Sequence, residues 1–188
     1  MTTIAAQAGL TEEQLLSLPH IGKAEMIDGR IIVSPAGYEH GGISMLLGSR
    51  LFLYAQSHRL GHVTDSSTGF WMKSGNLLSP DVSFVAKDRL RGMKGGMPRR
   101  FFCGSPDLVA EVLSPNDKPN EIERKLCEYF ETDTRLAWII DPVTGTVREY
   151  RSQQSSRELR IGDSLDGQDV VPGFTLPLAE LFAPPDFD

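Results

Sequence analysis

The sequence predicts an α/β fold in which a mixed β-sheet is flanked by α-helices, with an N-terminal hairpin and a C-terminal β extension. Residues 107–113 and 136–140 are predicted strands joined by a helical stretch at residues 120–131, and a strand–helix–strand crossover of this kind implies parallel pairing. Tight turns at residues 28–29 and 142–145 imply antiparallel hairpins. The order of the elements therefore requires both pairing directions.

The N-terminal half is predicted to contain two helices around the hairpin. Residues 11–18 begin with a capping-box pattern and end at a proline, which indicates a short helix. Asp28-Gly29 separates two short apolar runs and favours a hairpin turn. Residues 38–59 place apolar side chains at helical spacing, and the β-branched run at residues 81–85 predicts a strand.

The C-terminal half begins with a Gly- and Arg-rich connection at residues 87–105. After the strand–helix–strand unit, residues 146–150 return as a hairpin strand, and a last short helix is expected near residues 178–182. The sequence contains no repeat, linker or low-complexity tract, so all 188 residues are expected to form a single domain.

The composition is that of a globular protein, with 40% hydrophobic and 23% charged residues. The two cysteines, Cys103 and Cys127, are too few for a disulfide framework, which favours a cytoplasmic location. A membrane span needs about 18 consecutive apolar residues, and the sequence contains no such stretch. A membrane partner is therefore not expected.

The net charge of −6 argues against general affinity for nucleic acid, so any contact must come from a local basic patch. Residues 87–100 provide one candidate, because they carry six Lys and Arg side chains, including Lys94, Arg99 and Arg100, against a single acid. The alternative is that this segment is an ordinary solvated loop.

Two carboxylates occupy positions that a soluble fold normally avoids. Glu111 stands within an apolar strand, and Asp81 opens the run at residues 81–85 directly after a proline. Burying an unpaired charge is costly in free energy. A divalent cation that two carboxylates share offsets the cost of burying both of them. The sequence therefore predicts that the two strands are neighbours and that Asp81 and Glu111 lie at one end of them, with their carboxylates less than roughly 8 Å apart.

Lys125 borders the apolar stripe of the helix at residues 120–131 and could reach over the strand on which that helix packs. Its ammonium is then expected within about 6 Å of the Glu111 carboxylate. Pairing with Glu121 or Glu128, or extension into solvent, is the alternative. His40, at the start of a long helix, is more typical of a structural histidine than of a catalytic one.

Four motifs follow one another along the chain: Ser79-Pro80-Asp81-Val82, the run PDLVAEVLSP at 106–115, Arg124-Lys125-Leu126 with Tyr129, and Ile139-Ile140-Asp141-Pro142. Together they resemble the Uma-two family of endonucleases, which is widespread in bacteria and belongs to the restriction-endonuclease-like PD-(D/E)XK superfamily. Blocks around 25–29, 34–40, 171–174 and 181–182 extend the resemblance to nearly the whole chain.

The resemblance implies a restriction-endonuclease-like fold and assigns roles to particular residues. Asp81 and Glu111 correspond to the metal-binding acids, Glu25 to an acidic residue beside the metal, and Lys125 to a basic position in the following helix. The superfamily pattern places a lysine two residues after the acidic residue, and Leu113 stands there in this chain. Either Lys125 has taken over the function of that lysine, or the site has lost it.

The function that these assignments imply is that of an endonuclease which hydrolyses phosphodiester bonds with Mg²⁺ or Mn²⁺, acting as an endodeoxyribonuclease with DNA as partner. The resemblance also suggests a homodimer. The alternative is a non-catalytic nucleic-acid-binding or regulatory module that has kept the nuclease fold, and Leu113 is the residue that supports it.

Overall fold

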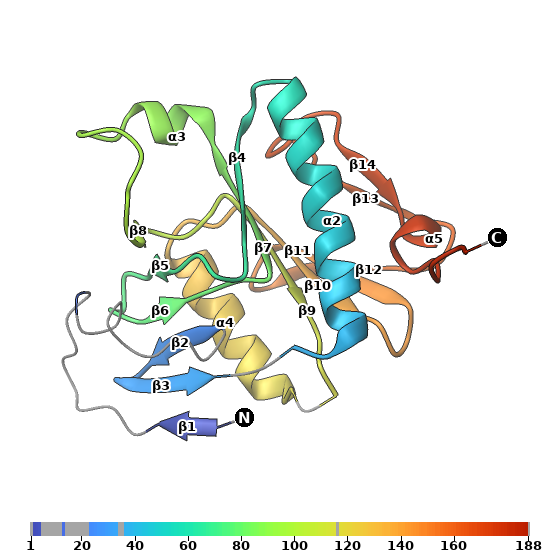
Figure 1. Cartoon of the computed structure of the whole chain (residues 1–188), viewed down its shortest axis with the longest axis horizontal. Helices are drawn as coiled ribbons and strands as arrows, with labels where there is room; N and C mark the ends of the chain where they lie inside the picture. Colours follow the sequence, from blue (N-terminus) through green and yellow to red (C-terminus); the bar gives the residue numbers. More distant parts are fainter. Residues whose placement is uncertain (1, 5–12, 14–22, 34–35, 116, 188) are drawn as a thin grey trace.

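The computed structural model describes residues 2–4, 13, 23–33, 36–115 and 117–187. Within these residues the chain forms two six-stranded sheets and a two-stranded sheet. Helices lie on both faces of the six-stranded sheet that contains β9 (Leu108–Val112) and β10 (Leu136–Asp141) (Figure 1). The helix predicted for residues 11–18 lies outside the described residues except for residue 13.

One six-stranded sheet forms the centre of the molecule. Its strands follow the spatial order β12-β11-β10-β9-β7-β4. β9 and β10 pair in parallel, whereas the other neighbouring strands pair antiparallel. The predicted mixed sheet is therefore confirmed, and its strands are β4 (Gly61–Asp65), β7 (Val82–Ala86), β9 (Leu108–Val112), β10 (Leu136–Asp141), β11 (Thr146–Ser152) and β12 (Ser155–Leu159).

The predicted N-terminal hairpin is present, and it belongs to a second sheet. Asp28 and Gly29 form its turn with φ angles of 50° and 72°, the left-handed conformation that such a two-residue turn requires. Pro80 separates β6 from β7, because it has no N–H to continue a ladder. This sheet follows the order β1-β3-β2-β6-β5-β8 and contains β1 (Thr2–Ile4), β2 (Ala24–Ile27), β3 (Arg30–Val33), β5 (Phe70–Trp71), β6 (Leu77–Leu78) and β8 (Phe102–Cys103).

Helices cover both faces of the central sheet (Figure 1). α2 (Tyr38–Ser57) lies on one face with the C-terminal extension, which consists of β13 (Ser164–Asp166), β14 (Thr175–Pro177) and α5 (Leu178–Leu181). α4 (Pro119–Glu131) lies on the other face, towards the second sheet. The predicted connection at 87–105 contains a short helix, α3 (Lys87–Arg91), and β8. No helix in the described part of the chain has both the length and the apolar character needed to cross a bilayer.

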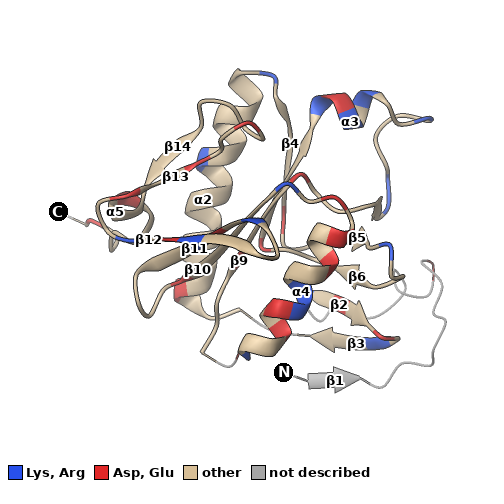
Figure 2. Ribbon diagram, turned by 180° about the vertical axis from the view of Figure 1, so that it is seen from behind, with Lys and Arg blue, Asp and Glu red and all other residues tan. Residues whose placement is uncertain are grey.

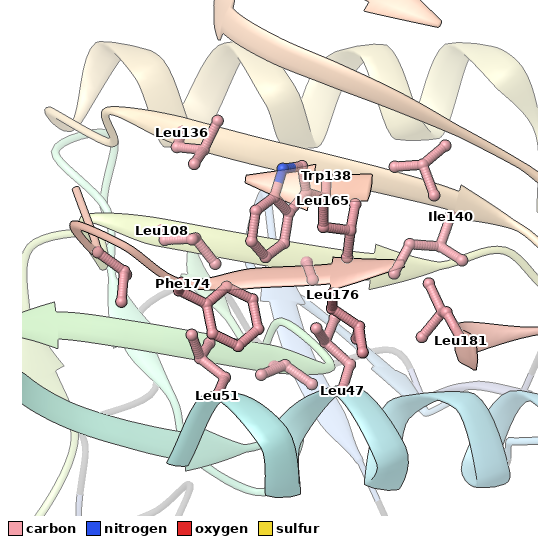
Figure 3. Packing of buried hydrophobic residues seen from close by; sticks show 14 of the residues in the cluster. Leu47, Leu51, Leu108, Leu136, Trp138, Ile140, Leu165, Phe174, Leu176 and Leu181 are labelled. Atoms are coloured by element: carbon pink, nitrogen blue, oxygen red, sulfur yellow. The ribbon is translucent and has the colours of Figure 1, made fainter. Parts of the chain in front are cut away.

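Two apolar cores hold these layers together, and β9 contributes to both of them. Leu108, Ala110 and Val112 point into the core beneath α2, which also contains Leu47 and Trp138 (Figure 3). The alternate residue Val109 points into the core beneath α4. Because side chains alternate along a strand, Glu111 faces α4 as well.

Candidate active site

The strand register brings Asp81 and Glu111 together at one end of β7 and β9. Val82 pairs with Ala110 in this antiparallel pair, and the same register continued by one residue sets Asp81 opposite Glu111. Side chains of directly opposed residues lie on the same face of a sheet. The predicted adjacency of the two strands and of the two acids is confirmed.

Asp81 is almost fully buried, and each of its carboxylate oxygens has partners. Oδ2 accepts hydrogen bonds from Nε2 of His40 at 3.0 Å and from the backbone N–H of Val112 at 2.8 Å. Oδ1 accepts a hydrogen bond from the Lys23 ammonium at 2.8 Å. Burial alone would raise the pKa of Asp81, but the hydrogen bond from His40 and the charge of Lys23 outweigh burial and hold it well below its ordinary value.

Glu111 is contacted by two residues of α4 and by Lys23, which directly precedes β2. The Tyr129 hydroxyl donates to Oε1 at 2.5 Å, and the Lys125 ammonium lies 3.4 Å from the same oxygen. Oε2 accepts from the Lys23 ammonium at 3.4 Å. Burial raises the pKa of Glu111 above its ordinary value, although the ammonium groups of Lys125 and Lys23 favour the charged form.

Glu25 adds a third carboxylate to the cluster from β2. Its Oε2 lies 2.9 Å from the Lys125 ammonium, and its Oε1 accepts from the backbone N–H of Ser79 at 3.0 Å. Both oxygens are therefore directed at protein donors. Glu25 thus holds Lys125 in place.

Lys125 makes the approach to Glu111 that its position in α4 predicted, and the expectation of a separation within about 6 Å is confirmed by the 3.4 Å contact. The alternative partners are engaged elsewhere, since Glu121 pairs with Lys118 and Glu128 accepts from Asn76. Burial alone would lower the pKa of Lys125, but the carboxylates of Glu111 and Glu25 raise it above its ordinary value. The ammonium therefore stays charged throughout the neutral range.

Leu113, which stands where the superfamily pattern has a lysine, packs partly buried against the core beneath α4. It shares the Glu111 face of β9, because the two residues are two positions apart. Lys125 reaches Glu111 from the helix, so a positive charge lies beside that carboxylate although position 113 carries none.

Three further residues of the site were not assigned to it from the sequence. Lys23 carried no signal, because it is a single lysine before the hairpin and belongs to none of the motifs. Tyr129 was assigned to the apolar stripe of α4, and its ring does pack in that core while its hydroxyl reaches Glu111. His40 was expected to be structural, yet its Nε2 contacts Asp81. The family motifs that contain Tyr129 and His40 are the signals that the sequence offers for these two residues.

The donor set fits a hard divalent cation. Among the described residues no group of three or more His, Cys, Asp and Glu side chains is arranged to hold a metal ion. Mg²⁺, however, needs only one or two carboxylates and keeps several waters. Asp81 Oδ1 and Glu111 Oε2 lie 2.8 and 3.4 Å from one nitrogen, so their separation is below the limit of roughly 8 Å for a shared ion.

The segment predicted to contact nucleic acid begins away from this cluster. Lys94, Arg99 and Arg100 are exposed, and Arg100 pairs with Glu13 at 3.5 Å. The basic segment starts at the end of β7 opposite to Asp81, a distance of roughly 17 Å at 3.3 Å per residue. Figure 2 likewise shows the basic residues of α3 apart from α4 and β2. The beginning of the basic segment therefore lies away from the carboxylates.

Comparisons with known proteins agree with this architecture. Residues 12–179 match the Uma2 family model, described as "Putative restriction endonuclease". The crystal structure of a protein from Anabaena variabilis, described as a putative nuclease belonging to DUF820, superposes with a TM-score of 0.79 at 23% identity, covering 92% of this chain and 97% of that one. At this identity the likeness concerns the fold. No curated protein matches the chain. Because the family model spans most of the sequence, the chain belongs to the Uma2 family of restriction-endonuclease-like proteins.

Proposed function

We propose that this protein is a metal-dependent endonuclease that hydrolyses phosphodiester bonds of DNA. The observation that carries the proposal is the convergence of Asp81 Oδ1 and Glu111 Oε2 on a single cationic group within a buried cluster. Two buried carboxylates contribute little to stability, because burying each of them costs desolvation free energy that two apolar side chains in the same place would not cost. Membership of the Uma2 family supports the same reaction class.

Asp81 and Glu111 would hold Mg²⁺ or Mn²⁺, which supplies Lewis-acid polarisation of the phosphate and a water of lowered pKa. Lys125 stays protonated, so it stabilises negative charge that develops on the phosphate and orients the attacking water. Glu25 fixes the Lys125 ammonium, and Tyr129 fixes Glu111 through its hydroxyl. His40 holds Oδ2 of Asp81.

The substrate is proposed to contact the exposed basic segment through Lys94, Arg99 and Arg100. Phosphate contacts of this kind do not need to lie beside the reacting atoms, because a duplex presents phosphates along its whole length. The homodimer that the family resemblance suggests stays a prediction, which sedimentation analysis measures directly.

A non-catalytic nucleic-acid-binding module is the second candidate, and Leu113 is the observation that favours it. The two functions differ in what Lys125 does. In a nuclease its ammonium acts on the reacting phosphate, whereas in a binding module it only neutralises Glu25 and Glu111.

The deciding experiment is cleavage of plasmid and linear DNA with Mn²⁺ by wild type, Lys125→Met and Asp81→Ala. Lys125→Met is expected to abolish cleavage while it leaves metal binding intact, and Asp81→Ala is expected to abolish both. Lys118→Met is the matched control, because this lysine lies at the start of the same helix and is well exposed. Cleavage by Lys125→Met at the wild-type rate would refute the role of Lys125. Absence of cleavage by the wild type would favour the binding module.

A further inference from the structure

Lys23 bridges the two carboxylates that are proposed to hold the metal. Its ammonium lies 2.8 Å from Oδ1 of Asp81 and 3.4 Å from Oε2 of Glu111. Only 16% of its side chain is exposed, and the two carboxylates are exposed by 1% and 5%. The ammonium is therefore a buried cation at the point where the acids converge.

The oxygens that Lys23 contacts have no other partner among the described residues. On Asp81 the other oxygen is held by His40 and Val112, and on Glu111 the other oxygen is held by Tyr129 and Lys125. Each carboxylate thus presents one oxygen to protein donors and one to Lys23. A divalent ion shared by Asp81 and Glu111 would need the two oxygens that Lys23 occupies.

Lys125 differs from Lys23 in this respect. Its ammonium contacts Oε2 of Glu25 and Oε1 of Glu111, and this second oxygen also accepts the hydrogen bond from Tyr129. It makes no ion pair with Asp81 among the described residues. Lys125 can therefore stay in place when a cation binds between Asp81 and Glu111, and Lys23 cannot.

A cavity beside Lys23 has room for its ammonium after displacement from the two carboxylates. The Lys23 side chain lines this cavity of about 180 Å³, which Asp117, Glu121 and Glu128 also line. A lysine ammonium sits on a flexible four-carbon stem, so it can move several ångströms by rotation of its side chain alone. Asp117, Glu121 and Glu128 give this cavity an acidic lining that attracts a displaced ammonium, although each of these carboxylates already has a partner of its own.

We propose that Lys23 is an internal counter-cation of the Asp81–Glu111 pair, which keeps the site assembled without metal and is displaced when a divalent ion binds. This inference rests on the proposed function, because it assumes that these two acids are the metal ligands. It makes Lys23 a positioning residue that lowers the affinity of the site for metal.

The test is calorimetric titration of Mg²⁺ into wild type, Lys23→Met, Lys23→Arg and Arg124→Met. Lys23→Met is expected to bind Mg²⁺ tenfold or more tightly than wild type, whereas Lys23→Arg, which keeps the charge, stays near wild type. Arg124→Met controls for a general loss of positive charge, since Arg124 lines the same cavity but pairs with Asp28. It is expected to leave the affinity unchanged.

Unchanged or weaker binding by Lys23→Met would overturn the proposal, and so would equal tightening by Arg124→Met. Either result leaves the proposed function intact as long as wild type binds Mg²⁺. Failure of every variant to bind would overturn both ideas together.

Nuclear magnetic resonance of the lysine ammonium groups in the wild type provides a measurement that does not depend on how Lys23→Met folds. Saturating Mg²⁺ is expected to shift or remove the Lys23 signal, assigned by its absence from Lys23→Arg, and to leave the Lys125 signal observable. A Lys23 signal that does not change at saturation would overturn the displacement.

Discussion

Replacement of Tyr129 by Phe tests how strongly the protein holds Glu111. The ring of Tyr129 is fully buried in the core beneath α4, so Phe keeps its packing and removes only the hydroxyl. That hydroxyl donates to Oε1 of Glu111 at 2.5 Å. A hydrogen bond to a charged group contributes about 1.5–3 kcal/mol, and its loss leaves a buried carboxylate with one donor fewer. We therefore expect unfolding free energy to fall by about 2 kcal/mol, which corresponds to roughly 4–8 °C in Tm for a chain of this length.

Urea denaturation of the metal-free protein, followed by circular dichroism, measures this loss. Tyr54→Phe is the matched control, because the Tyr54 hydroxyl makes an exposed hydrogen bond to the neutral carbonyl of Pro172 at 3.1 Å. Its loss should cost no more than about 1 kcal/mol. The reasoning is refuted if Tyr129→Phe costs no more than Tyr54→Phe. Tyr129→Phe and Glu111→Gln are expected to be coupled, because they change the two partners of one interaction. The reasoning is therefore also refuted if Tyr129→Phe lowers the unfolding free energy as much in a Glu111→Gln background as in wild type.

Three other predictions concern the metal, the substrate and the core. Asp81→Ala should abolish Mn²⁺ binding in a calorimetric titration, and retained binding would place the metal elsewhere. Combined Arg99→Glu and Arg100→Glu should weaken binding to duplex DNA and reduce the slope of log K against log salt by about 2, because each lost phosphate contact removes about 0.9 from it; an unchanged slope would mean that the segment is only solvated. Leu47→Ala, at a fully buried position of α2, should lower the unfolding free energy by about 2–5 kcal/mol in urea denaturation, and a loss below 1 kcal/mol or so would contradict its place in the core.

The sequence alone determined the elements whose causes are local. The turn at Asp28-Gly29 follows from two residues that tolerate positive φ angles, and the apolar stripe of α4 follows from a periodicity within 13 residues. The parallel pairing of β9 with β10 follows from the length of the crossover between them. Asp81 and Glu111 were identifiable because a carboxylate in an apolar strand is rare enough to require an explanation.

The tertiary structure alone decided which partners those carboxylates have. Lys23 lies 58 residues from Asp81 and 88 from Glu111, so no local pattern relates it to either acid. His40 and Tyr129 each belong to a helix whose periodicity is the same whether the side chain ends in the core or at a charge. The assignment of the N-terminal hairpin to a second sheet depends on a single pairing of β2 with β6. Periodicity gives the face of an element on which a residue lies. The group that the residue contacts there depends on how separate elements pack, because that packing is stabilised by burial over the whole interface and not by any single contact.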